Sequence, residues 1–251
     1  MRGHRILPLF LGLLLACEVL ATGPAVPRYK RLFRTWKDNP HASHAFFTPS
    51  AIALPQGNGY YQNSYVLMHS AWYAPLDGLS IGGGFQMMTL LASLRKDQDK
   101  LPGGFLALKA TKRFWPGVHG GLFVMGSQLS SKPSIGDTLS LGDRIATLMA
   151  QATFGTAEFH VTISAGSHYT MGRFTEDPQF GLSGQWRFTE GWGVVTENWL
   201  LDFGLKKMPI CSAGVRFYHR KLAADVAAVY NKDLAKGFGP VIPYFGFALR
   251  F

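Results

Sequence analysis

A period-two alternation of apolar and polar residues constrains the fold of this chain more than any other feature. The alternation begins near residue 43, and turn residues divide it into short segments. In residues 159–168, Phe159 and Ile163 fall on one face of an extended strand, while His160 and Ser164 fall on the other. Such a period is typical of half-buried β-strands and argues against a helical bundle.

The alternating segments predict twelve strands and two kinds of connection. The approximate strand ranges are 43–54, 60–74, 79–91, 103–114, 118–129, 144–154, 157–169, 179–188, 192–203, 210–218, 221–230 and 241–251. Tight turns are expected around residues 77–78, 116–117, 155–156, 190–191 and 219–220. Longer polar connections are expected at 92–102, 130–143, 170–178, 204–209 and 231–240.

This alternation of short turns with long loops is typical of an outer-membrane β-barrel, which has short periplasmic turns and long external loops. Aromatic residues near the strand ends match the two interfacial girdles of such a barrel. The expected girdle at the short turns is Tyr73, Phe114, Phe154, Phe188, Trp192, Phe217 and Phe251, and the other is Tyr169, Phe180, Trp199, Phe203 and Tyr230. We therefore predict an all-β fold, a transmembrane antiparallel up-and-down β-barrel of about twelve strands.

The C-terminal segment carries a more specific signal. Phe245, Phe247, Leu249 and Phe251 alternate with small or polar residues. This pattern resembles the terminal-strand signal by which Gram-negative outer-membrane barrels are recognised for assembly. Residues 39–63, which include FFTPS and GNGYYQ, are similar to the start of an uncharacterised bacterial barrel family. The resemblance implies an outer-membrane location and the barrel assembly machinery as a partner, but no particular activity.

The N-terminal residues predict export. Arg2 and Arg5 precede an apolar run at 6–16, and small residues follow at the end of residues 1–21, which we interpret as a signal peptide. The apolar run is too short to span a bilayer. Cys17 allows two interpretations, lipid attachment or a small apolar residue of the signal core. Because Cys211 is the other cysteine of the chain, we expect no disulfide in the exported protein.

Residues 22–42 are basic, with aromatic residues interleaved, and precede the barrel domain predicted at 43–251. They could form a plug or a surface-binding arm attracted to anionic headgroups. The alternative, which the usual disorder of chain termini favours, is a loosely ordered periplasmic leader. The formal net charge of the whole chain is +10.

The inward faces of the predicted strands are rich in basic residues. The pore-lining candidates are Lys109, Arg113, His160, Gln185, Arg187 and Arg216, and His69 is expected beside them. A basic lining favours the passage of anions. The same residues could instead form a closed, hydrogen-bonded interior.

Glu197 conflicts with the simple pattern. Strict alternation places it on the same face as Val195, Trp199 and Leu201, where an acid facing lipid would cost a few kcal/mol. Either a bulge turns Glu197 inward or the register of this strand is shifted. An inward Glu197 is expected to pair with an interior arginine.

The sequence offers little support for enzymatic chemistry. His160 and Ser164 share a strand face but lie four residues apart, roughly 13 Å along a strand, too far for a nucleophile and its base. Hydrolase, nucleotide and zinc motifs are not found. We therefore predict no catalytic residues, no cofactor, no metal and no nucleic-acid partner.

Three functions follow, in decreasing order of support. The first is a small channel or binding protein for a small anionic solute. The second is a non-catalytic structural or surface-interaction barrel that acts through its external loops. The third is a lipid-modifying enzyme. In each case the surroundings are outer-membrane lipid and lipopolysaccharide.

Overall fold

The computed structural model describes residues 39–93, 103–128, 144–170, 173–175, 177–202, 207–232 and 241–251. The predicted signal peptide, Cys17 and most of the predicted basic segment lie outside these residues. None of the helices in the described part is long and apolar enough to cross a membrane.

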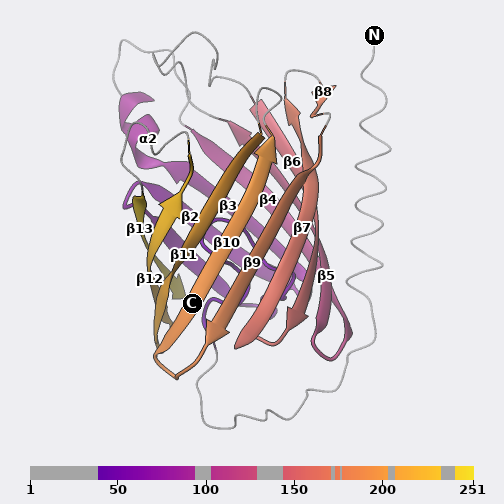
Figure 1. Ribbon diagram of the computed structural model, residues 1–251, viewed down its shortest axis with the longest axis vertical. Helices are drawn as coiled ribbons and strands as arrows, with labels where there is room; N and C mark the ends of the chain where they lie inside the picture. The colour runs from indigo at the N-terminus through magenta and orange to yellow at the C-terminus, as the bar shows by residue number, and fades with distance from the viewer. Residues whose placement is uncertain are drawn as a thin grey trace.

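The described residues form a closed antiparallel β-barrel (Figure 1). Its strands are β1 (Gly59–Ser64), β2 (Met68–Leu76), β3 (Leu79–Gln86), β4 (Gly104–Trp115), β5 (Val118–Gln128), β6 (Arg144–Gly155), β7 (Phe159–Thr170), β9 (Gln179–Arg187), β10 (Trp192–Asp202), β11 (Lys207–His219), β12 (Leu222–Tyr230) and β13 (Ile242–Arg250). A two-residue strand, β8 (Arg173–Phe174), pairs with the end of β7, and helix α2 (Met87–Ser93) follows β3.

Each barrel strand pairs with its sequence neighbour, and β1 pairs with β13 to close the cylinder. Two backbone hydrogen bonds between Gly59 and Phe251, of 3.1 and 2.9 Å, complete this seam. The start of β1 and the end of β13 therefore lie on the same side as the tight turns, as an even number of strands requires. Within the described residues, closure pairs each of the twelve barrel strands on both sides, as a lipid environment demands.

The predicted number of strands is confirmed, but two of the predicted ranges are wrong, and a third, 79–91, ends in helix α2 rather than in strand. Residues 43–54 form no barrel strand, and the range 60–74 is divided into β1 and β2. The turn between them contains Tyr65 and Val66 at φ values of 57° and 64°. Because neither is Gly, Pro, Asn or Asp, the sequence carried no turn signal there. The two errors cancel in the count.

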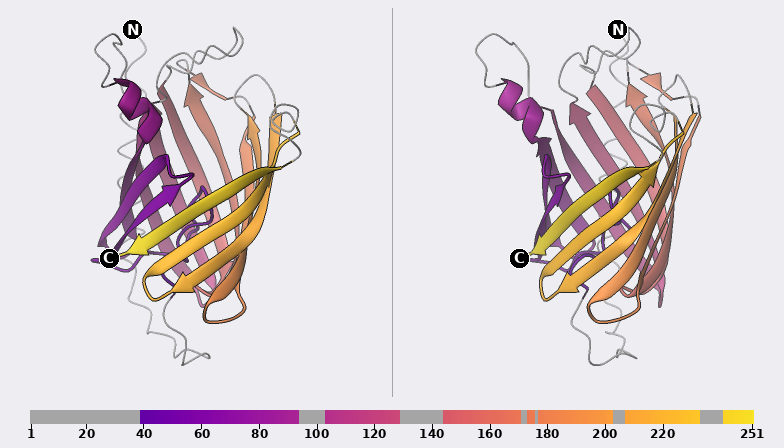
Figure 2. Two further views of the ribbon diagram at one scale, coloured as in Figure 1. Left: turned by 90° about the vertical axis from the view of Figure 1, so that its left-hand side faces the viewer. Right: turned by 60° about the vertical axis from the view of Figure 1, so that its left-hand side comes forward.

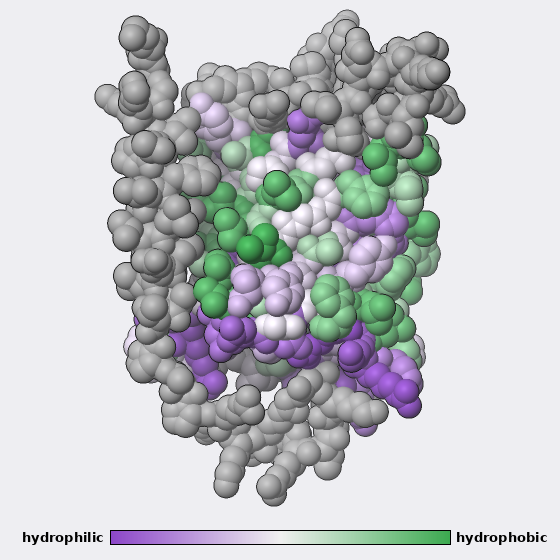
Figure 3. Space-filling model, turned by 180° about the vertical axis from the view of Figure 1, so that it is seen from behind, coloured by the Kyte–Doolittle hydropathy of each residue, from purple (hydrophilic) through white to green (hydrophobic). Residues whose placement is uncertain are grey.

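The outer surface is apolar over the middle of the barrel wall. Seen from behind, apolar side chains occupy much of its height and hydrophilic residues gather along the lower rim, near the tight turns (Figure 3). Phe159, Ile163, Leu182 and Trp186 are each about half exposed, on the faces that the alternation predicted. Such an exposed apolar belt matches a lipid-facing surface.

Strand β10 is oriented opposite to the prediction. Its burial alternates so that Val195, Glu197 and Trp199 are buried inside the barrel, and its pairing with β9 and β11 is continuous, with no bulge. Thr196 and Asn198 lie on the outer face, where Thr196 donates to the carbonyl of Ser212 and Asn198 donates to Thr196. Trp199 therefore does not belong to an outer aromatic girdle. The prediction assumed that apolar residues face lipid, which fails here because Val195 and Trp199 pack in apolar clusters inside the barrel.

Candidate functional site

Residues 39–54, called the plug below, lie inside the barrel (Figure 2). The plug folds back on itself, since the Ala45 amide donates to the Thr48 carbonyl at 2.8 Å and the Ser50 amide to the Ser43 carbonyl at 3.0 Å. No pairing between the plug and a barrel strand is found among the described residues. Side chains of the wall bind the plug backbone instead.

Lys109 on β4 is the first of three charged side chains that hold the plug. Its ammonium nitrogen donates to the carbonyls of Ser43, Ser50 and Ile52 at 3.2, 3.2 and 3.1 Å. The side chain is 2% exposed. All three donor sites of the ammonium are therefore occupied by plug carbonyls, which compensates in part for its burial.

Arg216 on β11 holds the other arm of the plug. Its guanidinium donates to the carbonyls of His41, His44 and Ala45 at 3.1, 3.0 and 2.8 Å. The same group forms a bidentate ion pair with Asp225, at 2.6 and 2.9 Å. Asp225 thus neutralises the guanidinium and fixes its plane, which aims the remaining donors at the plug.

Glu197 is the third charged group, and its partners differ from the predicted arginine. Its carboxylate accepts hydrogen bonds from the amides of Phe46 and Phe47, at 2.8 and 2.9 Å, and from the Thr48 hydroxyl at 2.5 Å. The indole nitrogen of Trp199 donates a fourth, at 2.7 Å. The prediction of an inward Glu197 paired with arginine is therefore wrong in its partner, because the amides of a plug turn take that place.

Neutral side chains complete the attachment. Gln62 donates to the Phe46 carbonyl at 3.0 Å, and Gln151 donates to the Pro49 carbonyl. The Ala51 amide donates to the Thr153 hydroxyl at 2.8 Å. These contacts come from β1 and β6, so the plug is bound on several sides of the lumen.

The predicted pore-lining residues lie at several levels of the lumen. Gln185 accepts from Arg216 at 2.9 Å, so Lys109, Gln185 and Arg216 belong to the plug network. Arg187 forms an ion pair with Glu158 at 3.1 Å, and the Arg113 Nε donates to the Trp115 carbonyl; both lie near the tight turns.

The two predicted interior histidines differ in place. His160 is buried inside the barrel, where its ring shares a hydrogen bond with the Thr156 carbonyl. His69 is partly buried near the end of β2, where its ring stacks on Phe85 of β3 at 5.1 Å and both side chains line the cavity described next.

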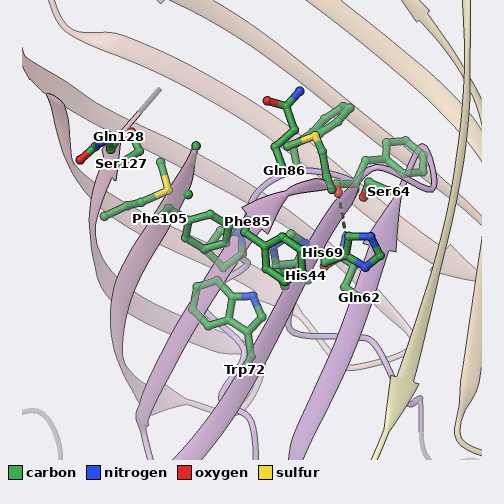
Figure 4. A pocket seen from close by; sticks show the side chains of 18 of the residues that line it. His44, Gln62, Ser64, His69, Trp72, Phe85, Gln86, Phe105, Ser127 and Gln128 are labelled. Carbon is green, nitrogen blue, oxygen red and sulfur yellow. Dashed lines mark hydrogen bonds between the residues drawn. The ribbon is translucent and has the colours of Figure 1, made fainter. Parts of the chain in front are cut away.

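A cavity of about 410 Å³ lies above the plug, between the plug and strands β1–β5 (Figure 4). Phe46, Phe47 and Pro49 of the plug form part of its lining, and Trp72 and Phe105 form part of the wall. No Asp, Glu, Lys or Arg occurs among its lining residues in the described part of the chain.

Two plug histidines are uncharged in this environment. Burial lowers the pKa of His44 to about 3, and the nearby positive charges of Lys109 and Arg216 act in the same direction. Burial also lowers the pKa of His41 well below its ordinary value, with Arg216 adding to the effect. Neither ring nitrogen of His41 has a hydrogen-bond partner among the described residues. A protonated His41 or His44 would therefore destabilise the seated plug.

Sequence reasoning missed most of the plug. It considered a plug only for residues 22–42, whereas the described plug extends to residue 54. One signal was available: Pro49 lies within the predicted strand 43–54 and Pro55 directly follows it, and proline is unfavourable inside a central strand.

Comparison with known proteins identifies the architecture. No protein-family model matches the chain, and no curated protein is similar to it in sequence. The solved structure of KdgM porin in complex with disordered oligogalacturonate matches with a TM-score of 0.51 and 8% identity, over 77% of this chain and 98% of that chain. A second KdgM porin structure matches with a TM-score of 0.50 and 7% identity over the same shares.

A weaker match is Omp33 of Acinetobacter baumannii, with a TM-score of 0.40 and 8% identity, over 77% of this chain and 96% of that chain. At such identities, the shared property is the fold. This chain is a β-barrel protein of the outer membrane, with twelve barrel strands and a plug that fills part of its lumen.

Proposed function

We propose that the protein is an outer-membrane channel for small solutes and that the plug closes it in the described state. The mode of attachment carries this proposal: side-chain hydrogen bonds hold the plug, and no strand pairing ties it to the wall within the described residues. Such a segment can leave the lumen without breaking the barrel. The fold shared with KdgM porin supports a transport role.

The anion preference predicted from the sequence is a separate proposal for the open channel. In the plugged state, Lys109 and Arg216 donate to plug carbonyls. Departure of the plug would expose both groups and Glu197 to the lumen, where Asp225 stays paired with Arg216 and Glu158 with Arg187. The predicted basic lining, Lys109, Arg113, Arg187 and Arg216, then outnumbers these three acids by one. We propose that the open pore then favours anions. The reversal potential of an open channel in a salt gradient measures this preference.

An engineered disulfide between plug and wall tests the channel function. An ideal Cβ at Gly121 on β5 would lie 3.4 Å from the Cβ of Ala51, close to the usual disulfide range of about 3.5–4.5 Å. The variant is Ala51→Cys with Gly121→Cys, in a Cys211→Ser background because Cys211 is exposed. Each single cysteine variant serves as its control.

We expect the oxidised protein to remain closed in planar bilayers and the reduced protein to show discrete conductance. The single-cysteine controls should conduct irrespective of the redox state. If the disulfide-bonded protein conducts, and equally before and after reduction, solutes do not pass through the space that the plug occupies. No conductance in any form would favour the structural or surface-interaction barrel.

We also propose that the barrel is not an enzyme. His160 binds the Thr156 carbonyl through its ring, and Ser164 lies four residues away on the same strand. We expect purified barrel to release no fatty acid from phospholipid or lipopolysaccharide. Hydrolysis that disappears in Ser164→Ala would refute this proposal.

The proposed partners are outer-membrane lipid, lipopolysaccharide and the barrel assembly machinery. Three residues of the predicted assembly signal, Phe245, Phe247 and Leu249, lie on the outer face of β13 and are 54%, 41% and 47% exposed. Phe251 follows the strand and is 57% exposed. Their position at the closing seam supports a role in recognition during assembly.

A further inference from the structure

The cavity above the plug has an apolar inner part. Trp72 and Phe123 are only 4% and 3% exposed, and their ring centroids lie 6.2 Å apart. Phe105 lies 6.4 Å from Trp72, and Met125 adds a thioether from β5. Aromatic rings and thioethers form favourable dispersion contacts with apolar ligands.

Two glycines of β3 allow these rings to lie against the wall. A Cβ at Gly82 would meet the Trp72 ring at 2.4 Å, and a Cβ at Gly84 would meet the Phe105 ring at 2.5 Å. Any larger residue at either position would displace the adjacent ring. The glycines therefore help to keep the space between the rings and the plug open.

The rest of the described lining is polar and contains no Asp, Glu, Lys or Arg, although the rings of His44 and His69 also reach it. Ser64, Ser70, Gln86, Ser127 and Gln128 contribute hydroxyl and amide groups, and Figure 4 shows Gln86, Ser127 and Gln128 at the ends of their strands. With no Asp, Glu, Lys or Arg in the described lining, a charged ligand would lose hydration without gaining a counter-charge. Hydroxyls and amides satisfy the polar end of a neutral ligand.

We infer that this cavity is a binding site for an uncharged amphiphile. Its aromatic or aliphatic body would lie against Trp72, Phe105 and Phe123, and its polar end would bind the hydroxyl and amide groups of the lining. A volume of about 410 Å³ is within the usual range for small-molecule sites, roughly 300–1,000 Å³. Phe46 and Phe47 of the plug would contact the bound molecule, so the site exists only while the plug is seated.

The test compares two fluorescent probes with related aromatic frameworks. N-phenyl-1-naphthylamine is uncharged, and 8-anilinonaphthalene-1-sulfonate is anionic. Both are titrated into the protein in detergent, and the non-saturating signal of empty micelles is subtracted. We expect saturable binding of the uncharged probe at one site per barrel and no comparable binding of the sulfonate.

Matched variants locate the site. Ser70→Phe and Met125→Trp place bulk in the cavity from β2 and β5, while Ala71→Phe and Val124→Trp place it on the outer face of the same strands. We expect the inward variants to weaken binding of the uncharged probe by at least about tenfold, equivalent to ~1.4 kcal/mol. The outward variants should leave it unchanged. Heat-modifiable migration on gels identifies the folded fraction of each variant.

Equal binding in all four variants would overturn the inference, because the probe would then occupy another site. Sulfonate binding that is as tight and is lost in the same two variants would overturn the assignment to uncharged ligands. The titration is repeated with the oxidised disulfide-tethered protein, which is closed by design. Probe binding to the tethered protein does not depend on conductance. A result against this binding site can therefore be distinguished from a result against the proposed channel.

Discussion

Replacement of Lys109 by methionine tests how firmly the wall holds the plug. Lys109→Met keeps a long side chain but removes three hydrogen bonds to plug carbonyls. A buried hydrogen bond contributes about 1 kcal/mol net after exchange with water, so the seated plug should lose ~3 kcal/mol. Since 1.4 kcal/mol corresponds to a factor of ten, the released fraction should rise on the order of 100-fold.

Cysteine labelling measures this fraction directly. Ala51 is fully buried in the plug, and Ala51→Cys in the Cys211→Ser background reacts with a membrane-impermeant maleimide only after the plug leaves. If release and return are fast relative to labelling, the rate is proportional to the released fraction. The Lys109→Met protein should therefore be labelled about 100-fold faster than its parent.

Lys112→Met is the matched control on the same strand. It removes the same charge, but no hydrogen bond from Lys112 to the plug is found within the described residues. Its labelling rate should match that of the parent. If Lys109→Met were labelled no faster than Lys112→Met, the inference that the buried ammonium retains the plug would be refuted.

Two further predictions concern pH and packing. Because burial lowers the pKa of His41 and His44 in the seated plug, the released plug binds more protons below pH ~6.5, so plug stability is complete above that pH and falls as the pH decreases. With a pKa of about 3 when seated, His44 alone should lower the stability of the seated plug by about 2 kcal/mol at pH 5. The cysteine-labelling rate, divided at each pH by that of the His41→Gln/His44→Gln variant, should therefore rise on acidification. A constant ratio would contradict the linkage. Gly82→Ala should destabilise the barrel by about 1–3 kcal/mol, measured by urea unfolding, because the new methyl overlaps the Trp72 ring. Gly126→Ala, whose methyl would meet open space, should not, and equal losses in both variants would argue against the overlap.

The sequence predicted the barrel wall well because the wall is governed by local rules. The alternation in 159–168 and 180–188 identified the outward faces of β7 and β9, and Lys109 was correctly placed on the inner face of β4. A side-chain period of two follows from the strand backbone itself, whatever the rest of the chain does. The positions of four of the five tight turns followed from their glycines in the same way, whereas the turn at 219–220 is His-Arg.

Local rules failed where an inward residue has a partner distant in sequence. Glu197 contacts residues about 150 positions earlier, and its face was misjudged because Val195 and Trp199 were assumed to seek lipid. Inside this barrel they pack in apolar clusters instead. An apolar side chain is stabilised equally by lipid and by a packed interior, so alternation alone cannot distinguish the two faces of such a strand.

The amino-acid sequence by itself determined that the chain forms strands, where most of them turn and that they close into an outer-membrane barrel. Only the tertiary structure decided what the barrel contains. Residues 43–54 alternate much as a strand does, and their place in the lumen depends on three charged groups from β4, β10 and β11 that the chain brings together only when the cylinder closes. Two of the basic residues predicted to line an open pore, Lys109 and Arg216, therefore bind the plug, because buried backbone carbonyls need hydrogen-bond donors and the wall supplies them.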